Sequence, residues 1–275
     1  MKFDMGAAWN EAVRLLAANR QVLLIVAGVF FFLPYVAFTL VFSNEMTALE
    51  AAQASNPDPK AMGQAMIGLY GQFWWLLLIM VVLQTIGVLG LLALLSDRTR
   101  PTVGEALAIG LKMLLPYFGA QLLMSCLYGL LLLVPIAVGV GVSVAAGALL
   151  GIVALVAFIY LFTKFLMVPP VIAIERVVNP LAAMGRSWRL TKGNSIRLFL
   201  FVFLLFVAVV VVGGVLGMVI GLALALAGPE VALVGNALVS GLVNAAFYTV
   251  FLAVLAAVHR QLTGAAPETV SETFS

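Results

Sequence analysis

Long uninterrupted apolar runs are the feature of this sequence that most restricts its fold. The hydrocarbon core of a bilayer is about 30 Å thick, so a helix needs about 20 consecutive apolar residues to cross it. Runs of that length occur at 22–43, 73–95, 196–225 and 231–258. A longer run at 118–168 has room for two spans, and residues 139–143 offer the turn between them. We therefore predict an all-α integral membrane protein with six transmembrane helices.

The amounts of apolar and charged residues and the positions of the cations agree with this prediction. Only 9% of the residues are charged and 64% are hydrophobic, whereas soluble proteins carry about 25% charged residues. If both termini are cytoplasmic, 13 of the 14 Lys and Arg residues lie inside and only Lys60 lies outside, as the positive-inside rule requires. The first apolar run is long and follows an amphipathic segment, which is typical of an anchor rather than a signal peptide.

The segment 179–193 has the pattern of an amphipathic helix that lies in the membrane surface. Asn179 suits the N-cap, Pro180 the first turn and Gly193 the position after the helix. Its apolar residues and its cations occupy different faces: Leu181, Met184 and Trp188 against Arg186, Arg189 and Lys192. In such a helix the cations lie at the level of the lipid phosphates.

The spacing of this helix occurs three times. A cap residue is followed ten residues later by a cation, at Asp4 and Arg14, Thr102 and Lys112, and Asn179 and Arg189. Glu105 completes a capping box with Thr102, and Pro116–Tyr117 is predicted to break that helix. Each copy precedes two spans, which end in a polar residue and arginine at Asp97, Glu175 and His259. We therefore predict one domain, 1–262, of three parallel repeats in a pseudo-threefold bundle, at about 4–97, 102–176 and 179–260.

Two segments are expected to lie outside the spans. Residues 44–72 form a periplasmic loop, with a short helix capped by Asn44 and a turn at Pro57–Asp58–Pro59. Residues 263–275 are polar and lack periodicity, so we expect a disordered cytoplasmic tail.

Glycine and proline in the odd-numbered spans predict bends and close packing. Candidate bends are Pro34, Pro135 and Gly213–Gly214, and Gly213, Gly217 and Gly221 predict a packing ridge.

Polar residues recur every four positions along one face of the last span, at Asn236, Ser240, Asn244 and Tyr248. They either hydrogen-bond to neighbouring helices or line the polar pathway of a small transporter or channel. Lys164 is the deepest cation. Its ammonium either extends to the interface or, after a bend at Pro169–Pro170, pairs with Glu175 or with a lipid phosphate.

The cations of the amphipathic helices are the predicted functional residues: Arg14, Lys112, Arg186, Arg189 and Lys192. They either anchor the helices to phospholipid in general, or converge on one anionic headgroup or soluble phosphate. The expected partners are anionic membrane phospholipids, with a membrane protein or a second copy of the chain as alternatives. No nucleic acid is expected.

Catalytic and metal-binding patterns are missing from the sequence. His259 is the only histidine and Cys126 the only cysteine, and no Cys, Asp or Glu stands beside His259 at ligand spacing. No strand–turn nucleophile elbow fits an all-helical chain. We expect no enzyme activity, no catalytic residue, no metal and no cofactor.

Residues 164–199, "KFLMVPPVIAIERVVNPLAAMGRSWRLTKGNSIRLF", resemble the membrane domain of the glycerophosphodiester phosphodiesterase family and the related YciC-like inner-membrane proteins. The similar features are Lys164, Pro169 and Glu175, followed by Arg-Ser-Trp-x-Leu-Thr-x-Gly at 186–193. The resemblance implies a helical domain in the bacterial inner (cytoplasmic) membrane. In the fused relatives a separate soluble domain carries catalysis, and that domain has no counterpart in this sequence. The resemblance therefore does not imply phosphodiesterase activity.

Overall fold

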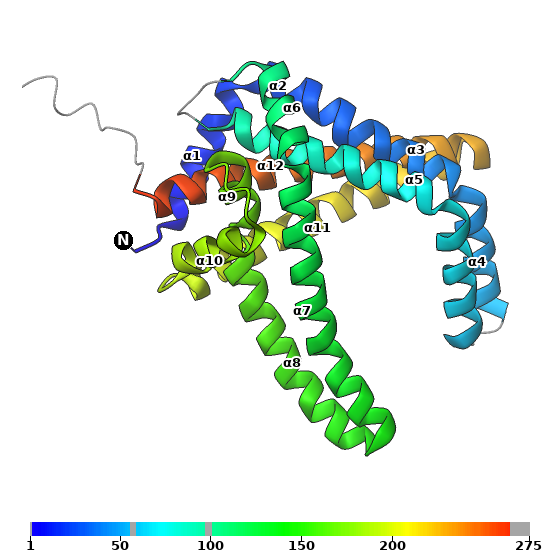
Figure 1. The fold of residues 1–275 in the computed structure, drawn as a ribbon. Helices are drawn as coiled ribbons and strands as arrows, with labels where there is room; N and C mark the ends of the chain where they lie inside the picture. The colour runs from blue at the N-terminus through cyan, green and yellow to red at the C-terminus, as the bar shows by residue number, and fades with distance from the viewer. Residues whose placement is uncertain (1, 56–58, 97–100, 265–275) are drawn as a thin grey trace, which may run out of the picture. The chain divides into compact units, whose positions relative to one another are not determined.

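The computed structural model describes residues 2–55, 59–96 and 101–264. In these ranges the regular secondary structure is helical (Figure 1). Six stretches are long and apolar enough to cross a membrane: Arg20–Val41, Met62–Leu94, Leu114–Gly141, Val144–Ile174, Ser195–Ala225 and Pro229–Leu262. The prediction of an all-α membrane protein with six spans is confirmed.

The three amphipathic segments form separate helices, α1 (Met5–Ala18), α6 (Val103–Lys112) and α10 (Pro180–Thr191). The remaining elements belong to the spans and their connections: α2 (Arg20–Ala27), the π-helix η1 (Gly28–Phe32), α3 (Leu33–Val41), α4 (Ser43–Ser55), α5 (Pro59–Leu94), α7 (Leu114–Gly141), α8 (Val144–Phe165), α9 (Val168–Ile174), α11 (Ser195–Ala225) and α12 (Pro229–Leu262).

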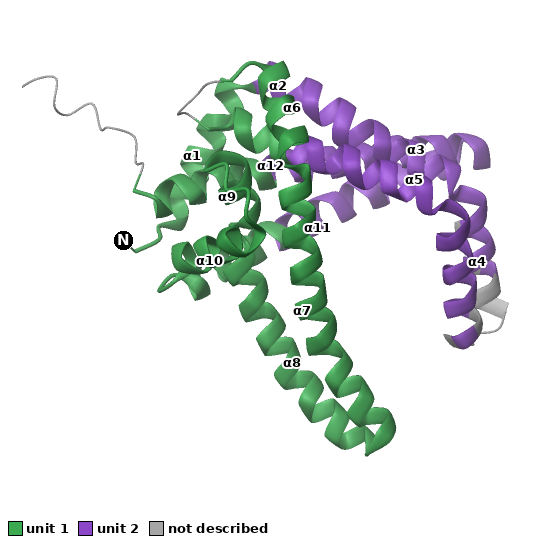
Figure 2. Ribbon diagram, viewed as in Figure 1, with its two compact units in different colours: residues 1–19, 89–206, 251–275 green, residues 20–88, 207–250 purple. Residues whose placement is uncertain are grey.

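The chain divides into two compact units (Figure 2). Unit 1 contains residues 1–19, 89–206 and 251–275, and unit 2 contains residues 20–88 and 207–250. Unit 1 therefore holds all three amphipathic helices, together with α7, α8 and α9 and the last turns of α5 and α12. The candidate site described below belongs to unit 1.

The predicted caps of the amphipathic helices are confirmed. The side chains of Asp4 and Asn179 accept hydrogen bonds from backbone N–H groups in the first turns of α1 and α10. Thr102 and Glu105 form the predicted capping box of α6. Gly193 follows α10 with φ of +82°, a left-handed conformation that favours glycine.

The three amphipathic helices bury residues at the same distances from their caps. Four and eight residues after the cap residue the side chain is small, and eleven residues after it is large and apolar. These buried residues are Ala8, Ala12 and Leu15 of α1, Ala106, Gly110 and Met113 at α6, and Ala183, Ser187 and Leu190 of α10. Small residues four apart allow a helix to approach its neighbours closely. The shared register supports the three repeats, whose arrangement stays a prediction.

Two predicted boundaries are wrong. The break after α6 comes at Met113 rather than at Pro116, because proline in the first turn of α7 occupies a position whose N–H has no helical partner. Helix α4 begins at Ser43, so Asn44 lies inside it. The turn residues Pro57 and Asp58, the repeat end at Asp97 and the tail beyond Gly264 lie outside the described residues.

The predicted hairpin between the third and fourth spans is confirmed. Helix α7 ends at Gly141, and the Ser143 side chain caps α8 by accepting a hydrogen bond from the Ala146 N–H. A Cβ at Gly147 would lie 2.4 Å from the Gly139 Cα. Glycine at this position therefore permits the close approach of α7 and α8.

The bends predicted at proline and the packing ridge predicted at glycine are found at some of the positions and not at others. In unit 2 the π-helix η1 ends at Phe32, two residues before Pro34 of α3, so the helical hydrogen-bond pattern changes close to the predicted bend. Pro135 lies inside the continuous helix α7. A Cβ at Gly213 would lie 2.9 Å from the Val243 side chain of α12, whereas Gly217 has open space beside it. The ridge is therefore a packing face for only part of its length.

Candidate functional site

Ser187 attaches α10 to the junction between α8 and α9. Its hydroxyl donates a hydrogen bond to the Lys164 carbonyl oxygen at 2.7 Å and accepts one from the Met167 N–H at 3.2 Å. Backbone hydrogen bonding is interrupted at this junction because Pro169 and Pro170 have no N–H. The sequence reasoning missed this role of Ser187. The sequence did offer one indication: Ser187 is a small polar residue eight residues after the cap, where the other two amphipathic helices have Ala12 and Gly110.

Lys164 lies in the last turn of α8 and is covered by aromatic side chains. The residue is 3% exposed. Its Nζ lies 5.4 Å from the centre of the Tyr160 ring and 5.2 Å from that of Trp188. Within the described part of the chain, no carboxylate forms an ion pair with it. Of the alternatives considered for Lys164, the pairing with Glu175 is therefore not formed.

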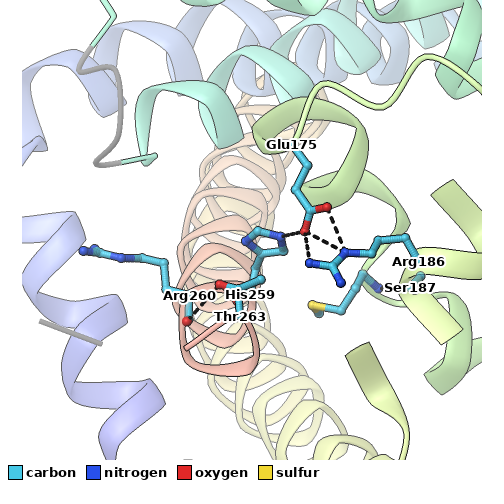
Figure 3. Close-up of polar contacts among 7 residues, drawn as sticks. Glu175, Arg186, Ser187, His259, Arg260 and Thr263 are labelled. Carbon is cyan, nitrogen blue, oxygen red and sulfur yellow. Dashed lines mark hydrogen bonds and ion pairs between the residues drawn. The ribbon is translucent and has the colours of Figure 1, made fainter. Parts of the chain in front are cut away.

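Glu175 instead binds two other basic side chains (Figure 3). Its Oε2 accepts a hydrogen bond from Arg186 Nε at 2.9 Å, and its Oε1 lies 2.9 Å from His259 Nε2. The contact with His259 joins residues 84 positions apart. Arg176 follows directly with φ of 57°, the one positive φ among the described non-glycine residues, and turns the chain from α9 toward α10. The ends of α9 and α12 and the middle of α10 therefore meet at one carboxylate.

The charged form of Glu175 is favoured by this arrangement. Burial raises the pKa of Glu175, but the hydrogen bonds and charges of Arg186 and His259 outweigh burial and hold the pKa below its ordinary value of 4.5. The carboxylate therefore contributes stability above pH 4.5, and this contribution is lost as the pH falls through the lowered pKa.

A second carboxylate, that of Glu11 in α1, also holds two arginines. Arg14 donates hydrogen bonds to its two oxygens at 2.8 and 2.9 Å, and Arg260 of α12 donates another. The hydrogen bond from Arg14 lowers the pKa of Glu11, while burial opposes this effect. Arg14 remains 57% exposed. Glu11 therefore links α1 to the end of α12 and leaves part of the Arg14 side chain at the surface.

The residues before α1 attach the N-terminus to α11 and α12. The Phe3 N–H donates to Asn194 Oδ1 at 2.9 Å, and Arg197 donates to the Phe3 carbonyl at 3.4 Å. Gln261 of α12 exchanges two hydrogen bonds with the backbone of Asp4. Helix α1 thus contacts the spans of the third predicted repeat.

The other two amphipathic helices contact spans in the same cyclic order. Helix α10 packs against α7, α8 and α9, which belong to the second predicted repeat. Leu107 of α6 lies against Gly90 of α5, in the first. Each amphipathic helix therefore contacts the repeat before it, and α1 contacts the last.

The five cations predicted to contact phosphate fall into two groups. Arg14 and Arg186 each bind a carboxylate. Lys112, Arg189 and Lys192 are exposed and form no ion pair with any residue that the structure describes. The second group can meet an anion without breaking an existing ion pair.

The polar stripe of α12 lies in unit 2. Asn236 and Ser240 are exposed, and the Tyr248 ring stacks on Phe31 with 4.9 Å between ring centres. Asn244 Oδ1 is buried without a hydrogen-bond partner. The interhelical hydrogen bond that was one prediction for this stripe is therefore absent at that oxygen.

The family comparison matches this part of the chain. Residues 142–264 match the model of the membrane domain of glycerophosphoryl diester phosphodiesterase. The matched range contains α8 to α12 and includes Lys164, Glu175, Arg186 and His259. The resemblance to this family is confirmed, and the relation to YciC-like proteins stays a prediction. No curated protein and no solved structure matches the chain.

We predict that Ser187→Ala destabilises the protein by about 1–3 kcal/mol, because it removes a buried hydrogen bond and leaves the Met167 N–H without its partner. Thermal unfolding in detergent would measure the effect. Ser240→Ala, at an exposed serine of α12, is the matched control and should leave the melting temperature unchanged. Equal melting temperatures for Ser187→Ala and wild type would contradict the role of Ser187.

Proposed function

We propose that this protein is a non-enzymatic membrane protein whose amphipathic helices bind anionic phospholipid at the cytoplasmic surface of a bacterial inner membrane. The observation that carries the proposal is the exposure of cations beside exposed apolar side chains on these helices. Lys112 follows Leu111, which is 63% exposed, and Arg189 follows Trp188, which is 37% exposed. Exposed Trp and Leu suit the acyl region, and Lys and Arg suit the phosphate layer.

The orientation of the helices follows from the charges and supports the same proposal. Helices α1, α6 and α10 belong to unit 1, together with the described ends of all three even-numbered spans. Cytoplasmic termini put 13 of the 14 Lys and Arg residues on that side. A basic inner face attracts anionic headgroups by about 1 kcal/mol for each Lys or Arg close to the surface.

A non-enzymatic role is compatible with the family match. The matching model is that of a membrane domain, and the resemblance implies that catalysis in the fused relatives belongs to a different domain. Among the described residues no group of three His, Cys, Asp or Glu side chains could hold a metal ion. The Glu175 cluster is tied into ion pairs between helices, which gives it a structural role.

The test is lipid retention by the purified full chain. We expect the double variant Lys112→Ala/Arg189→Ala to bind phosphatidylglycerol about tenfold more weakly than wild type or worse, since two cations are removed from the lipid-facing surface. Native mass spectrometry in a mild detergent, with phosphatidylglycerol added in steps, would measure the bound lipid.

The control for this test is Lys60→Ala, which removes the one cation that the proposed orientation places on the opposite side of the membrane. It should retain lipid as wild type does. If Lys112→Ala/Arg189→Ala and Lys60→Ala retain lipid equally, the helices do not select anionic lipid. A protein partner would then become the better explanation of the exposed cations.

A small transporter or channel is the second candidate, and the observation that favours it is the unpaired Asn244 Oδ1. An unpaired buried carbonyl costs about 1–3 kcal/mol in a dry interior, whereas a water-filled pathway would hydrate it. The melting temperature of Asn244→Leu distinguishes the two cases. We expect a rise of several degrees, because leucine removes the cost.

Asn236→Leu is the control for this substitution, because Asn236 belongs to the same stripe but is exposed. A melting temperature of Asn244→Leu below that of wild type would indicate a hydrated pathway and would favour the transporter.

A further inference from the structure

Lys164 carries a positive charge that the surrounding protein does not neutralise. Its ammonium has three N–H donors, and the described residues offer it neither a carboxylate nor a hydrogen-bond acceptor. The cation–π contacts with Tyr160 and Trp188 and the negative end of the α8 dipole favour a cation here without satisfying those donors. A covered, unpaired ammonium is unfavourable unless an anion completes it.

The Lys164 ammonium is not completely enclosed by the protein, although the residue as a whole is buried. Among the described residues, the fully enclosed polar side-chain atoms without a partner are Glu45 Oε2 and Asn244 Oδ1. Lys164 Nζ is not one of them although it has no acceptor. Its nitrogen therefore keeps some surface outside the aromatic cover, which a ligand atom needs for contact.

Lys192 provides a second positive charge on α10, the helix whose Trp188 ring lies against Lys164. It is exposed and is the C-cap residue of α10. Trp188, one helical turn before Lys192, contributes the ring that lies against the Lys164 ammonium. Neither Lys164 nor Lys192 forms an ion pair with a carboxylate of the described residues, so an anion close to both would be stabilised.

The face of α8 that continues from Lys164 into the span is open and apolar. Tyr160, Val156 and Val153 lie four, eight and eleven residues before Lys164, so they share its side of the helix, and all three are exposed. Positive charge at the end of an apolar, open helix face matches the two parts of a phospholipid, a phosphate and an acyl chain. A soluble phosphate would use only the charged end.

We propose that Lys164 and Lys192 together bind the phosphate of one membrane phospholipid, whose acyl chain lies along Tyr160, Val156 and Val153 of α8. This site rests on the proposed function and makes it more specific. Lys112 and Arg189 attract the anionic surface in general, whereas the Lys164 site holds one lipid. Ser187 positions the site, because it attaches α10 at the Lys164 carbonyl and so places Trp188 against the ammonium.

The test compares binding of the first phosphatidylglycerol molecule by wild type, Lys164→Met, Lys192→Met and the control Lys60→Met, at a lysine outside the three amphipathic helices. Methionine keeps the length and apolar cover of lysine and removes its charge. Native mass spectrometry of the full chain in mild detergent would give the dissociation constant of the first lipid. We expect Lys164→Met to weaken it about tenfold or more and Lys192→Met severalfold, with Lys60→Met close to wild type.

Thermal unfolding gives a second readout that a merely structural lysine would not reproduce. Without lipid, Lys164→Met should melt at or above the wild-type temperature, because it removes an unpaired charge. Phosphatidylglycerol should raise the melting temperature of wild type more than that of Lys164→Met, since a ligand stabilises the state that binds it. If Lys164→Met does not fold, the surface variant Lys192→Met still tests the site by both measurements.

Three results would overturn the proposal. Wild-type lipid binding by both Lys164→Met and Lys192→Met, with weaker binding by Lys112→Ala/Arg189→Ala, would remove this site and leave the proposed function in place. Unchanged binding by all of these variants would reject both. Displacement of the first lipid by millimolar inorganic phosphate, with an equal rise in melting temperature, would identify a soluble phosphate site instead of a lipid site.

Discussion

The two hydrogen bonds of Ser187 are the interaction on which the rest of the site depends. Pro169 and Pro170 interrupt the backbone hydrogen bonds between α8 and α9, and the Ser187 hydroxyl bonds to the Lys164 carbonyl and the Met167 N–H at that junction. The two residues that flank Ser187 in the sequence contact different partners. Arg186 reaches Glu175, and Trp188 reaches the Lys164 ammonium. The three consecutive residues Arg186, Ser187 and Trp188 therefore act together: the buried Ser187 hydroxyl fixes the helix, and this orients the Arg186 guanidinium and the Trp188 ring.

Carboxylates divide the basic residues of unit 1 by role. Glu11 and Glu175 each bind two basic side chains and join an amphipathic helix to the end of a span. Arg14 and Arg186 are used for this purpose, so the number of basic residues in unit 1 is larger than the number available to an anion. The cations that remain without a carboxylate among the described residues include Lys112, Arg189, Lys192 and Lys164. Their neighbours are exposed Leu, Trp and Tyr side chains, which is the surrounding expected at a headgroup layer.

The spans and the helix caps could be predicted from the sequence because they depend on local patterns. The length of an apolar run determines where a span can lie. A cap is determined by a side-chain oxygen that can accept a hydrogen bond from the backbone N–H about three residues later, in the first turn of the helix. The site depends on long-range contacts, such as that between Glu175 and His259, which no spacing indicates. The helical wheel of α10 separated its apolar face from its cations but did not indicate which side of the helix meets the protein. Leu181 and Trp188 of the apolar face are exposed, whereas Ala183, Ser187 and Leu190 are buried.

The central proposal is that α1, α6 and α10 lie at one membrane surface, the cytoplasmic one, with their cations toward it. Cysteine labelling tests this most directly, because Cys126 is the only native cysteine. In a Cys126→Ala background, Arg14→Cys, Lys112→Cys and Arg189→Cys would be treated singly with a membrane-impermeant maleimide. The account predicts labelling of all three in inverted inner-membrane vesicles and of none in intact spheroplasts. Labelling of any one of them from the outside would contradict it.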